Sequence, residues 1–313
     1  SGGTYIYMAI RRGPLAQPKS GTEVFAMDTR YSAGSNPAYR SGWPVDMDLV
    51  RIIDGVNTWS LQDRLRGKVR LSTNSTDAES TWDERYDFNN GWGEATGADP
   101  TRFSWMWKRA PGFCDVVAYT GDGVAGRTVS HNLGVAPEMM WVKQRSSGNE
   151  WFVYVGSLGN TNKLELNNTS ASGSAAVGGN QLWNSTTPTS SVFSVSDNVR
   201  VNESGQTYIA YLFATLPGVS KVGSVSHTSG SATNVDCGFT SGARFILLKV
   251  TDSSGSWFVY DTTRGIVAGN DARLKLDSTA AENTGNDDID PLSSGFTITS
   301  TVSTGSYIFY AIA

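Results

Sequence analysis

A cassette that occurs three times is the feature that most constrains this fold. The three copies open at Trp59, Trp151 and Trp257. Each then enters a strand in which leucine alternates with a polar residue, and we expect Leu71, Leu166 and Leu276 to be equivalent there. Roughly a hundred residues separate successive copies, which is longer than a solenoid repeat and close to one small domain. The spacing therefore predicts three domains in tandem, as separate beads.

The composition indicates an all-β protein. Of 313 residues, 34 are glycine, 12 tyrosine and 10 tryptophan, which fits short strands joined by tight turns. The formal net charge of −4 and the pI of about 5.3 argue against a phosphate-binding surface, because nucleic-acid binders need a concentrated basic face. We expect no nucleic-acid partner.

Cysteine use and hydropathy narrow the class further. Cys114 and Cys237 stand at positions that do not correspond between copies, so we expect free thiols and no disulfide framework. No apolar run approaches the roughly 20 residues that cross a bilayer, so no membrane insertion is expected. The first residues carry no initiator methionine and no signal-peptide pattern, which indicates a chain that belongs to a longer one.

A closing strand, rich in aromatic and β-branched residues, recurs four times without polar alternation. This pattern predicts a strand that is buried on both faces. The four segments are 5–10, 102–108, 207–214 and 306–313. Because only three cassettes match them, residues 1–20 are expected to be the closing strand of a preceding module plus a proline-containing linker. The module boundaries then fall at 21–111, 112–217 and 218–313.

Each of the three units has enough strands for a β-sandwich. A strand before each cassette, at 44–51, 137–144 and 243–250, forms a hairpin with the tryptophan strand across a turn-forming segment. At least six short strands fall within about a hundred residues in the later copies. The expected fold class is therefore all-β, with three tandem antiparallel β-sandwich modules.

Several segments resemble a known family. The segments 121–137, 141–143 and 163–169 look like the tandem concanavalin-like repeats of bacteriophage tail-fibre and other virion structural proteins. The segments 63–67 and 71–79 are similar to the first-repeat pattern of that family. The resemblance extends from residue 21 to residue 313. It implies concanavalin-like, jelly-roll type modules and a virion structural protein, in a tail fibre or related appendage involved in host attachment.

The resemblance also implies partners and a location. Other virion proteins are expected partners, a host-surface saccharide or protein is a further one, and the protein would reside in the virion after assembly in the cytoplasm of the bacterial host. Trimerisation about the fibre axis is a common source of stiffness, so a homotrimer is expected. Two alternatives remain open: a capsid-surface fibre or decoration protein, and an appendage-borne glycan-degrading enzyme.

The carboxylates do not favour catalysis. A glycanase would present clustered carboxylates across a groove, and the nearest pair on one strand face is Asp46 and Asp48. We expect both to be solvated on an outer face, with Met47 and Leu49 pointing inward. The positions aligned with the pair are Met139, Trp141, Phe245 and Leu247. This face is then not acidic across the repeats, and the protein is not expected to be an enzyme.

No metal or cofactor is expected either. The acidic loop 286–290 lacks the spacing of an EF-hand loop. The two histidines, His131 and His227, have no zinc-like spacing and are expected in turns or on the surface. The Gly-x-Ser-x-Gly motif of a nucleophile elbow is also missing from the sequence.

Aromatic residues gather in the first copy. Six of the ten tryptophans lie there, and the polar insertion 79–92 has no close equivalent in the third copy. Aromatic faces beside polar side chains are used in sugar and protein recognition. We therefore predict a receptor- or glycan-binding site at Trp82, Arg85, Tyr86, Asp87 and Trp92. The alternative is that these aromatic residues cap the end of the sandwich or pack on a neighbouring subunit.

Overall fold

Strands make up 44 % and helices 3 % of the chain in its computed structural model, so the expected all-β class is confirmed. The structure describes residues 16–30, 36–94, 99 and 101–313. The expected closing strand at 5–10 and the first part of the linker lie outside the described residues. Short helical turns occur at η1 (Gly21–Glu23), η2 (Gly156–Leu158) and α1 (Val199–Asn202).

Three antiparallel main sheets follow one another along the chain. Their strands are β1 (Phe25–Thr29), β3 (Met47–Ile52), β4 (Ser60–Asp63) and β9 (Arg102–Trp107); β10 (Cys114–Thr120), β12 (Met139–Gln144), β13 (Phe152–Val155), β14 (Asn162–Glu165), β15 (Gly173–Ser174) and β19 (Thr207–Phe213); and β20 (Ser220–His227), β22 (Phe245–Val250), β23 (Trp257–Asp261), β24 (Asp271–Lys275), β25 (Asn283–Asn286) and β28 (Gly305–Ile312). The strand order repeats, as β1-β9-β3-β4, β10-β19-β12-β13-β14-β15 and β20-β28-β22-β23-β24-β25. We call the units built on these sheets lobes 1, 2 and 3.

A smaller sheet covers one face of each main sheet. These sheets consist of β2 (Tyr39–Arg40), β7 (Glu84–Arg85) and β8 (Gly91–Glu94); of β11 (Arg127–Ser130) and β18 (Val192–Val195); and of β21 (Thr233–Asp236), β26 (Ile289–Leu292) and β27 (Gly295–Ile298). Two further ribbons pair β5 (Val69–Arg70) with β6 (Ser80–Thr81) and β16 (Ala176–Val177) with β17 (Asn180–Gln181). Each lobe holds a hydrophobic cluster of its own between its layers.

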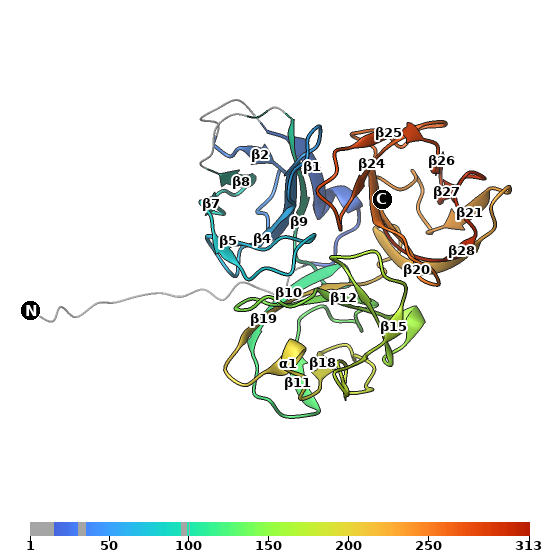
Figure 1. Ribbon diagram of the computed structural model, residues 1–313. Coiled ribbons are helices and arrows are strands. Elements are labelled where there is room, and N and C mark those ends of the chain that lie inside the picture. The colour runs from blue at the N-terminus through green and yellow to red at the C-terminus, as the bar shows by residue number, and fades with distance from the viewer. Residues whose placement is uncertain (1–15, 31–35, 95–98, 100) are drawn as a thin grey trace, which may run out of the picture.

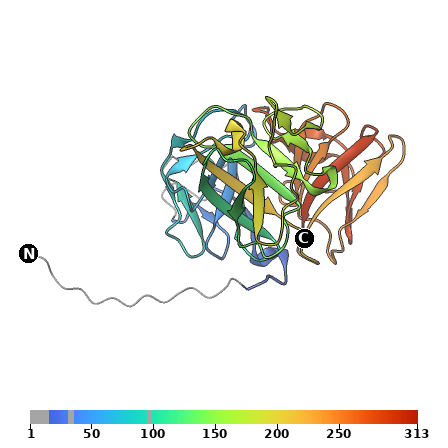
Figure 2. The same ribbon diagram turned by 90° about the horizontal axis from the view of Figure 1, so that it is seen from below.

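The second face of every main sheet packs against the other two lobes. Figure 1 shows the three lobes around a common centre, and Figure 2 shows them packed against one another. One buried cluster at that centre, the shared core, includes Trp105 of lobe 1, Trp141 of lobe 2 and Leu247 of lobe 3. The central strands of the main sheets are therefore buried on both faces, which accounts for their unbroken apolar sequences; these strands are β3, β9, β12, β19, β22 and β28. The prediction of separate beads is wrong, because the lobes close into a ring around one core.

The cassette tryptophans bond each lobe to the next. Every indole Nε1 donates to a backbone oxygen of a different lobe, at 2.8 to 2.9 Å. The pairs are Trp59 with Lys275, Trp151 with Ser72, and Trp257 with Glu165. These bonds run from lobe 1 to lobe 3, from lobe 3 to lobe 2, and from lobe 2 to lobe 1. The repeated tryptophan thus provides one hydrogen bond at each of the three junctions of the ring.

Strand pairing corrects the equivalence of the leucines. Leu71 bridges to Leu61, just as Leu164 pairs with Val153 and Leu274 with Val259. Leu71 therefore corresponds to Leu164 and Leu274. The expected match with Leu166 and Leu276 is shifted by two residues, and Thr73 occupies that position in lobe 1. The shift arises because this strand of the first copy has Leu71 alone where the other copies have two alternating leucines, so the sequence leaves its register open.

Two of the three junctions carry a buried acidic residue. The Tyr211 hydroxyl of lobe 2 donates to Asp63 of lobe 1 at 2.7 Å, and the Trp105 indole of lobe 1 donates to Asp261 of lobe 3 at 2.8 Å. Each aspartate also pairs with an arginine three residues later. Those arginines are Arg66 and Arg264.

The third junction, between lobes 2 and 3, is apolar at the same place. Strand pairing puts Val155 where lobes 1 and 3 have Asp63 and Asp261. Leu158 takes the place of the arginine three residues later. The hydroxyl of Tyr310, which corresponds to Tyr211, has no carboxylate partner among the described residues and lies near the Trp107 indole of lobe 1. Lobes 2 and 3 are thus joined without the ion pair that lobe 1 uses on both sides.

Lobes 1 and 3 also meet along their backbones. Arg51 donates to the carbonyl oxygens of Thr279 and Ala280 at 3.3 and 2.9 Å, and the amide of Glu282 donates to Ile53 at 2.8 Å. At Gly21 the two lobes come so close that an added Cβ would lie 1.9 Å from the carbonyl oxygen of Ala313. Only glycine fits there.

Candidate functional site

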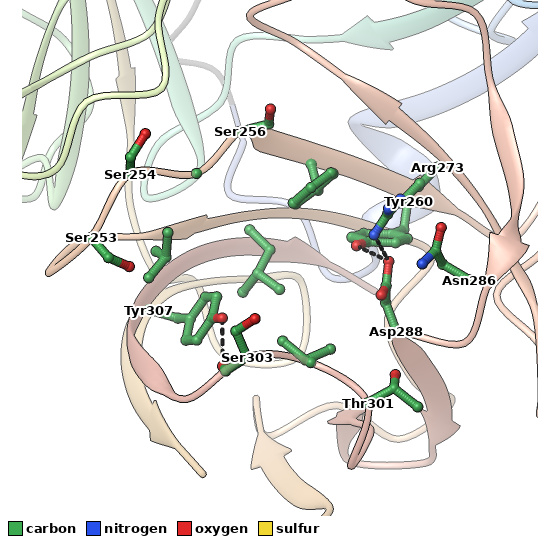
Figure 3. Close-up of a pocket in the computed structure, with 15 residues that line it drawn as sticks. Ser253, Ser254, Ser256, Tyr260, Arg273, Asn286, Asp288, Thr301, Ser303 and Tyr307 are labelled. Carbon is green, nitrogen blue, oxygen red and sulfur yellow. Dashed lines mark hydrogen bonds and ion pairs between the residues drawn. The ribbon is translucent and has the colours of Figure 1, made fainter. Parts of the chain in front are cut away.

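The main candidate site is a pocket of about 380 Å³ in lobe 3, shown in Figure 3. Leu248 and Val250 of β22, Phe258 and Tyr260 of β23 and Arg273 of β24 contribute from the main sheet. The segments 253–256, 286–288 and 301–303 complete the rim. The pocket thus lies where the inner face of the sheet meets three loops, a position that loops can vary without disturbing the strands.

One wall of the pocket is an ordered polar group. Asp288 accepts a hydrogen bond from the Tyr260 hydroxyl at 2.8 Å and pairs with Nη1 of Arg273. The Arg273 guanidinium lies 4.6 Å above the ring of Phe258, a cation–π contact. Nε of Arg273 is buried and has no partner among the described residues. Figure 3 shows Asn286 beside this group, with Ser253 and Tyr307 across the pocket.

The chemistry of this wall is that of a neutral hydrogen-bonding surface. Burial raises the pKa of Tyr260 well above its ordinary value, so the phenol stays protonated and donates to Asp288. Arg273 and Asp288 cancel each other in charge. Hydroxyl groups and one amide supply the other polar atoms. The pocket offers donors, acceptors and aromatic surface without a net charge.

Glycines let the pocket wall pack closely. An added Cβ at Gly255 would lie 2.5 Å from Cγ1 of Val250, and one at Gly305 would lie 2.9 Å from Cγ2 of the same residue. Both are positions where a side chain would push the loop away from the sheet. The turn 253–256 therefore holds its serines at the rim because Gly255 can approach Val250.

Trp92, from the site predicted in lobe 1, is a core residue. Its side chain has no exposure, its Nε1 donates to the Ser104 hydroxyl at 3.0 Å, and its ring stacks on Tyr39 at 4.7 Å. Strand pairing places it where lobes 2 and 3 have the buried Phe193 and Phe296. The polar sequence around Trp92 concealed this equivalence.

The other predicted residues are spread over two places. Tyr86 is mostly buried, donates its hydroxyl to Asp48, and lines with Asp87 a shallow hollow of about 310 Å³. Trp82 does not line this hollow; it is half-buried under the guanidinium of Arg70, at 3.6 Å. Arg85 is also half-buried and does not line the hollow. The five residues therefore do not form one surface.

A basic residue on an aromatic ring recurs at one position in all three lobes. Arg70, Lys163 and Arg273 each precede the equivalent leucine of the cassette. The aromatic rings beneath them belong to Trp82, Phe152 and Phe258, and the cationic groups lie 3.6, 5.6 and 4.6 Å from the respective ring centroids. Sequence reasoning missed Arg273 and Asp288, although the recurring basic residue before leucine was a usable signal for the first of them.

The interior of lobe 1 is polar where the other lobes are apolar. Asp48, expected to be solvated, is fully buried, because it faces the core of its own lobe while Met47 and Leu49 face the shared core. Strand pairing aligns Asp48 with Met140 and Ile246, one residue from the expected alignment. The side chain of Asp48 accepts the Tyr86 hydroxyl, and burial raises its pKa.

Two glutamates continue this polar interior. Glu84 is buried, both of its carboxylate oxygens lack a partner among the described residues, and burial raises its pKa to about 7. Glu94 pairs with Arg30 at 3.1 Å and with Arg102 at 2.8 Å. The positions equivalent to Glu84 and Glu94 in lobe 3 are Ile289 and Ile298. Lobe 1 thus holds carboxylates where a sandwich core normally holds apolar side chains.

Comparison with known proteins identifies a family but no activity. A family model described as a domain of unknown function (DUF7483) matches residues 106–313. The chain belongs to the DUF7483 family. The DUF7483 match begins within β9 and includes all of lobes 2 and 3, so most of lobe 1 lies outside it. Neither a curated protein nor a solved structure matches the chain.

The described part of this DUF7483 protein has no metal-binding cluster, and its cysteines and histidines are buried. Within the described residues, no three His, Cys, Asp or Glu side chains lie close enough together to hold a metal ion, and no helix is long and apolar enough to cross a membrane. Cys114 and Cys237 are buried free thiols. The histidines were expected in turns or on the surface. His131 lies in the loop after β11 and His227 at the end of β20, and both side chains are buried, with Nε2 of each ring bonded to a carbonyl oxygen.

Proposed function

We propose that this protein is a structural component of a bacteriophage virion, part of a tail fibre or related appendage that takes part in host attachment, and that it is not an enzyme. Each lobe would be a compact concanavalin-like module of jelly-roll type. Its partners would be other virion proteins and, at the host surface, a saccharide or protein.

The observation that carries this proposal is the shared core. Three lobes that bury one face of each main sheet against the others form a rigid unit, since the cluster draws on all three sheets. The indole hydrogen bonds fix the orientation of each lobe relative to the next. Loops at the outer ends of the lobes remain open to solvent, and the lobe 3 pocket lies among them. Rigid support with variable loops suits an attachment appendage.

The assembly proposed is a homotrimer. Coaxial association of three chains would stiffen a fibre further. Light scattering of the purified chain at micromolar concentration tests this, with three times the 33.6 kDa chain mass expected. A monomer would argue against it.

Two experiments test the role itself. Purified protein, incubated with host cells before phage is added, should compete with the phage and lower adsorption. Antibody labelling of intact particles should then mark the tail. Label on the capsid would instead support the alternative of a capsid-surface fibre or decoration protein, and unchanged adsorption would count against host attachment.

One observation supports the second alternative, an appendage-borne glycan-degrading enzyme. The raised pKa values of Asp48 and Glu84 give lobe 1 two carboxyl groups that hold a proton more tightly than usual, as a general acid does. We expect no soluble sugar to be released when the protein is incubated with host envelopes. Release by the wild type, lost in Glu84→Gln, would overturn the non-enzymatic assignment.

A further inference from the structure

We propose that the lobe 3 pocket binds a neutral saccharide unit, with the Arg273–Asp288 pair on the sugar hydroxyls and the aromatic side chains Phe258 and Tyr307 against its C–H surface. The inference rests on the proposed attachment role for the origin of the sugar, which would be a host-surface glycan. Binding itself is tested separately below.

The size and mixed lining of the pocket fit one sugar unit better than a protein segment. Its volume of about 380 Å³ falls at the lower end of the range for small-molecule sites, about 300 to 1,000 Å³. Leu248 and Val250 give the pocket an apolar floor, and hydroxyl-bearing loops give it a polar rim. A sugar ring presents the same combination, with C–H groups on its faces and hydroxyls at its edge.

The charge balance selects against an anionic ligand. Of the described residues that line the pocket, Arg273 and Asp288 are the only charged ones, and they pair with each other. A phosphate or carboxylate would have to be desolvated against a wall of no net charge, which is unfavourable. A neutral polyol avoids that cost.

The polar wall is also prepared for hydroxyl groups. Asp288 is fixed by Tyr260 and Arg273, so its oxygens are positioned before a ligand arrives. Nε of Arg273 is a buried donor without a partner in the described chain. Such an orphan donor is destabilising unless water or a ligand accepts from it. The Arg273 side chain is 18 % exposed and that of Asp288 9 %, so a sugar hydroxyl in the pocket can accept from the guanidinium and donate to the carboxylate.

Lobe 2 serves as an internal comparison. At the equivalent position Lys163 pairs with Glu165, and the ring of Phe152 is buried. In lobe 3 the ring of Phe258 is half-exposed and lines the pocket. The open pocket is therefore a departure of lobe 3 from the same scaffold and is not required by the fold.

Saturation-transfer NMR on the full chain tests the proposal. The probes are glucose, galactose, mannose, N-acetylglucosamine and, as the anionic comparison, N-acetylneuraminic acid. We expect transfer to at least one neutral sugar. Ser303→Trp, at an exposed rim position, should fill the pocket and weaken binding at least tenfold. Ser190→Trp, at an exposed serine of lobe 2, is the matched control and should bind as the wild type does.

Each outcome decides the inference. It is overturned if none of the neutral sugars receives transfer, if the anionic sugar binds most tightly, or if Ser303→Trp binds like the control with the same melting temperature. If Ser303→Trp loses the sugar but competes with phage adsorption as well as the wild type, the host-glycan origin fails while the attachment role stands. If the sugar binds but no form competes, the attachment role fails and the pocket assignment stands.

Discussion

Glu84 should make the stability of lobe 1 fall as the pH rises toward 8. Its pKa in the folded chain is about 7, against an ordinary value of 4.5. The folded state therefore binds more protons than the unfolded state between these values, and the stabilisation is complete below pH 4.5 and lost as the pH rises through 7. At about 1.4 kcal/mol for each pKa unit, the loss amounts to about 3 kcal/mol.

The test is Glu84→Ile, which introduces the residue that lobe 3 has at the equivalent position, Ile289. Denaturant unfolding is followed by tryptophan fluorescence at pH 5, 6, 7 and 8. The variant should gain free energy of unfolding relative to the wild type, and the gain should grow by about 2.5 kcal/mol between pH 5 and 8. The difference between the two proteins isolates Glu84 from other titrating groups. Asp48→Met in addition should flatten the remaining slope, because the pKa of Asp48 is raised in the same direction.

Glu23→Ile, at an exposed glutamate of η1, is the control and should leave the pH dependence unchanged. A variant at position 84 with the slope of the wild type would refute the reasoning. The reasoning would also be refuted if the wild type became more stable relative to the variant as the pH rises, because folding would then stabilise the carboxylate.

Three further perturbations address the ring. Asp261→Val alone should cost about 1 to 3 kcal/mol in denaturant unfolding, because it removes the acceptor of the Trp105 indole and leaves the buried Arg264 with Glu282 as its remaining carboxylate partner, whereas adding Arg264→Leu, which copies lobe 2, should recover part of that loss; equal losses in the single and double variants would contradict this. Trp59→Phe removes the indole bond to Lys275 and should lower the free energy of unfolding by about 1 to 3 kcal/mol, and an unchanged value would show that the bond adds nothing. Burial lowers the pKa of Lys249 from 10.5 to about 8. Between these pH values the unfolded state binds one more proton than the folded state, so the free energy of unfolding should rise with pH from 8 to 10.5. Lys249→Met should abolish that rise, as measured by the melting temperature at about pH 8 and 10.

The all-β class was predictable, and so was burial of the closing strands on both faces, because both depend on local composition. What covers the second face was not, since a run of apolar residues does not reveal whose atoms lie against it. The same sequence suits a strand inside one sandwich and a strand between two lobes. That ambiguity is why separate beads were expected where the chain forms the shared core.

The candidate site was less predictable for a related reason. Trp92 lies in a polar segment and looked like an exposed aromatic residue, but cross-strand pairing puts it in a core position that Phe193 and Phe296 fill elsewhere. Asp48 looked solvated because its neighbours are apolar, although a strand with two buried faces leaves no solvated side. Arg273 and Asp288 are 15 residues apart, so only the fold brings them together.

The contact between Gly21 and Ala313 gives the backbone a nearly circular path. The chain runs through lobes 1, 2 and 3 in turn and returns to within van der Waals distance of the place where lobe 1 begins. In a closed circuit of this kind no lobe is intrinsically first. A short peptide bridge across that contact, with new ends opened at the exposed Pro217 and Gly218 between lobes 2 and 3, should give a permuted chain with the same three junctions, because each is made by side chains and strands that this relocation leaves in place.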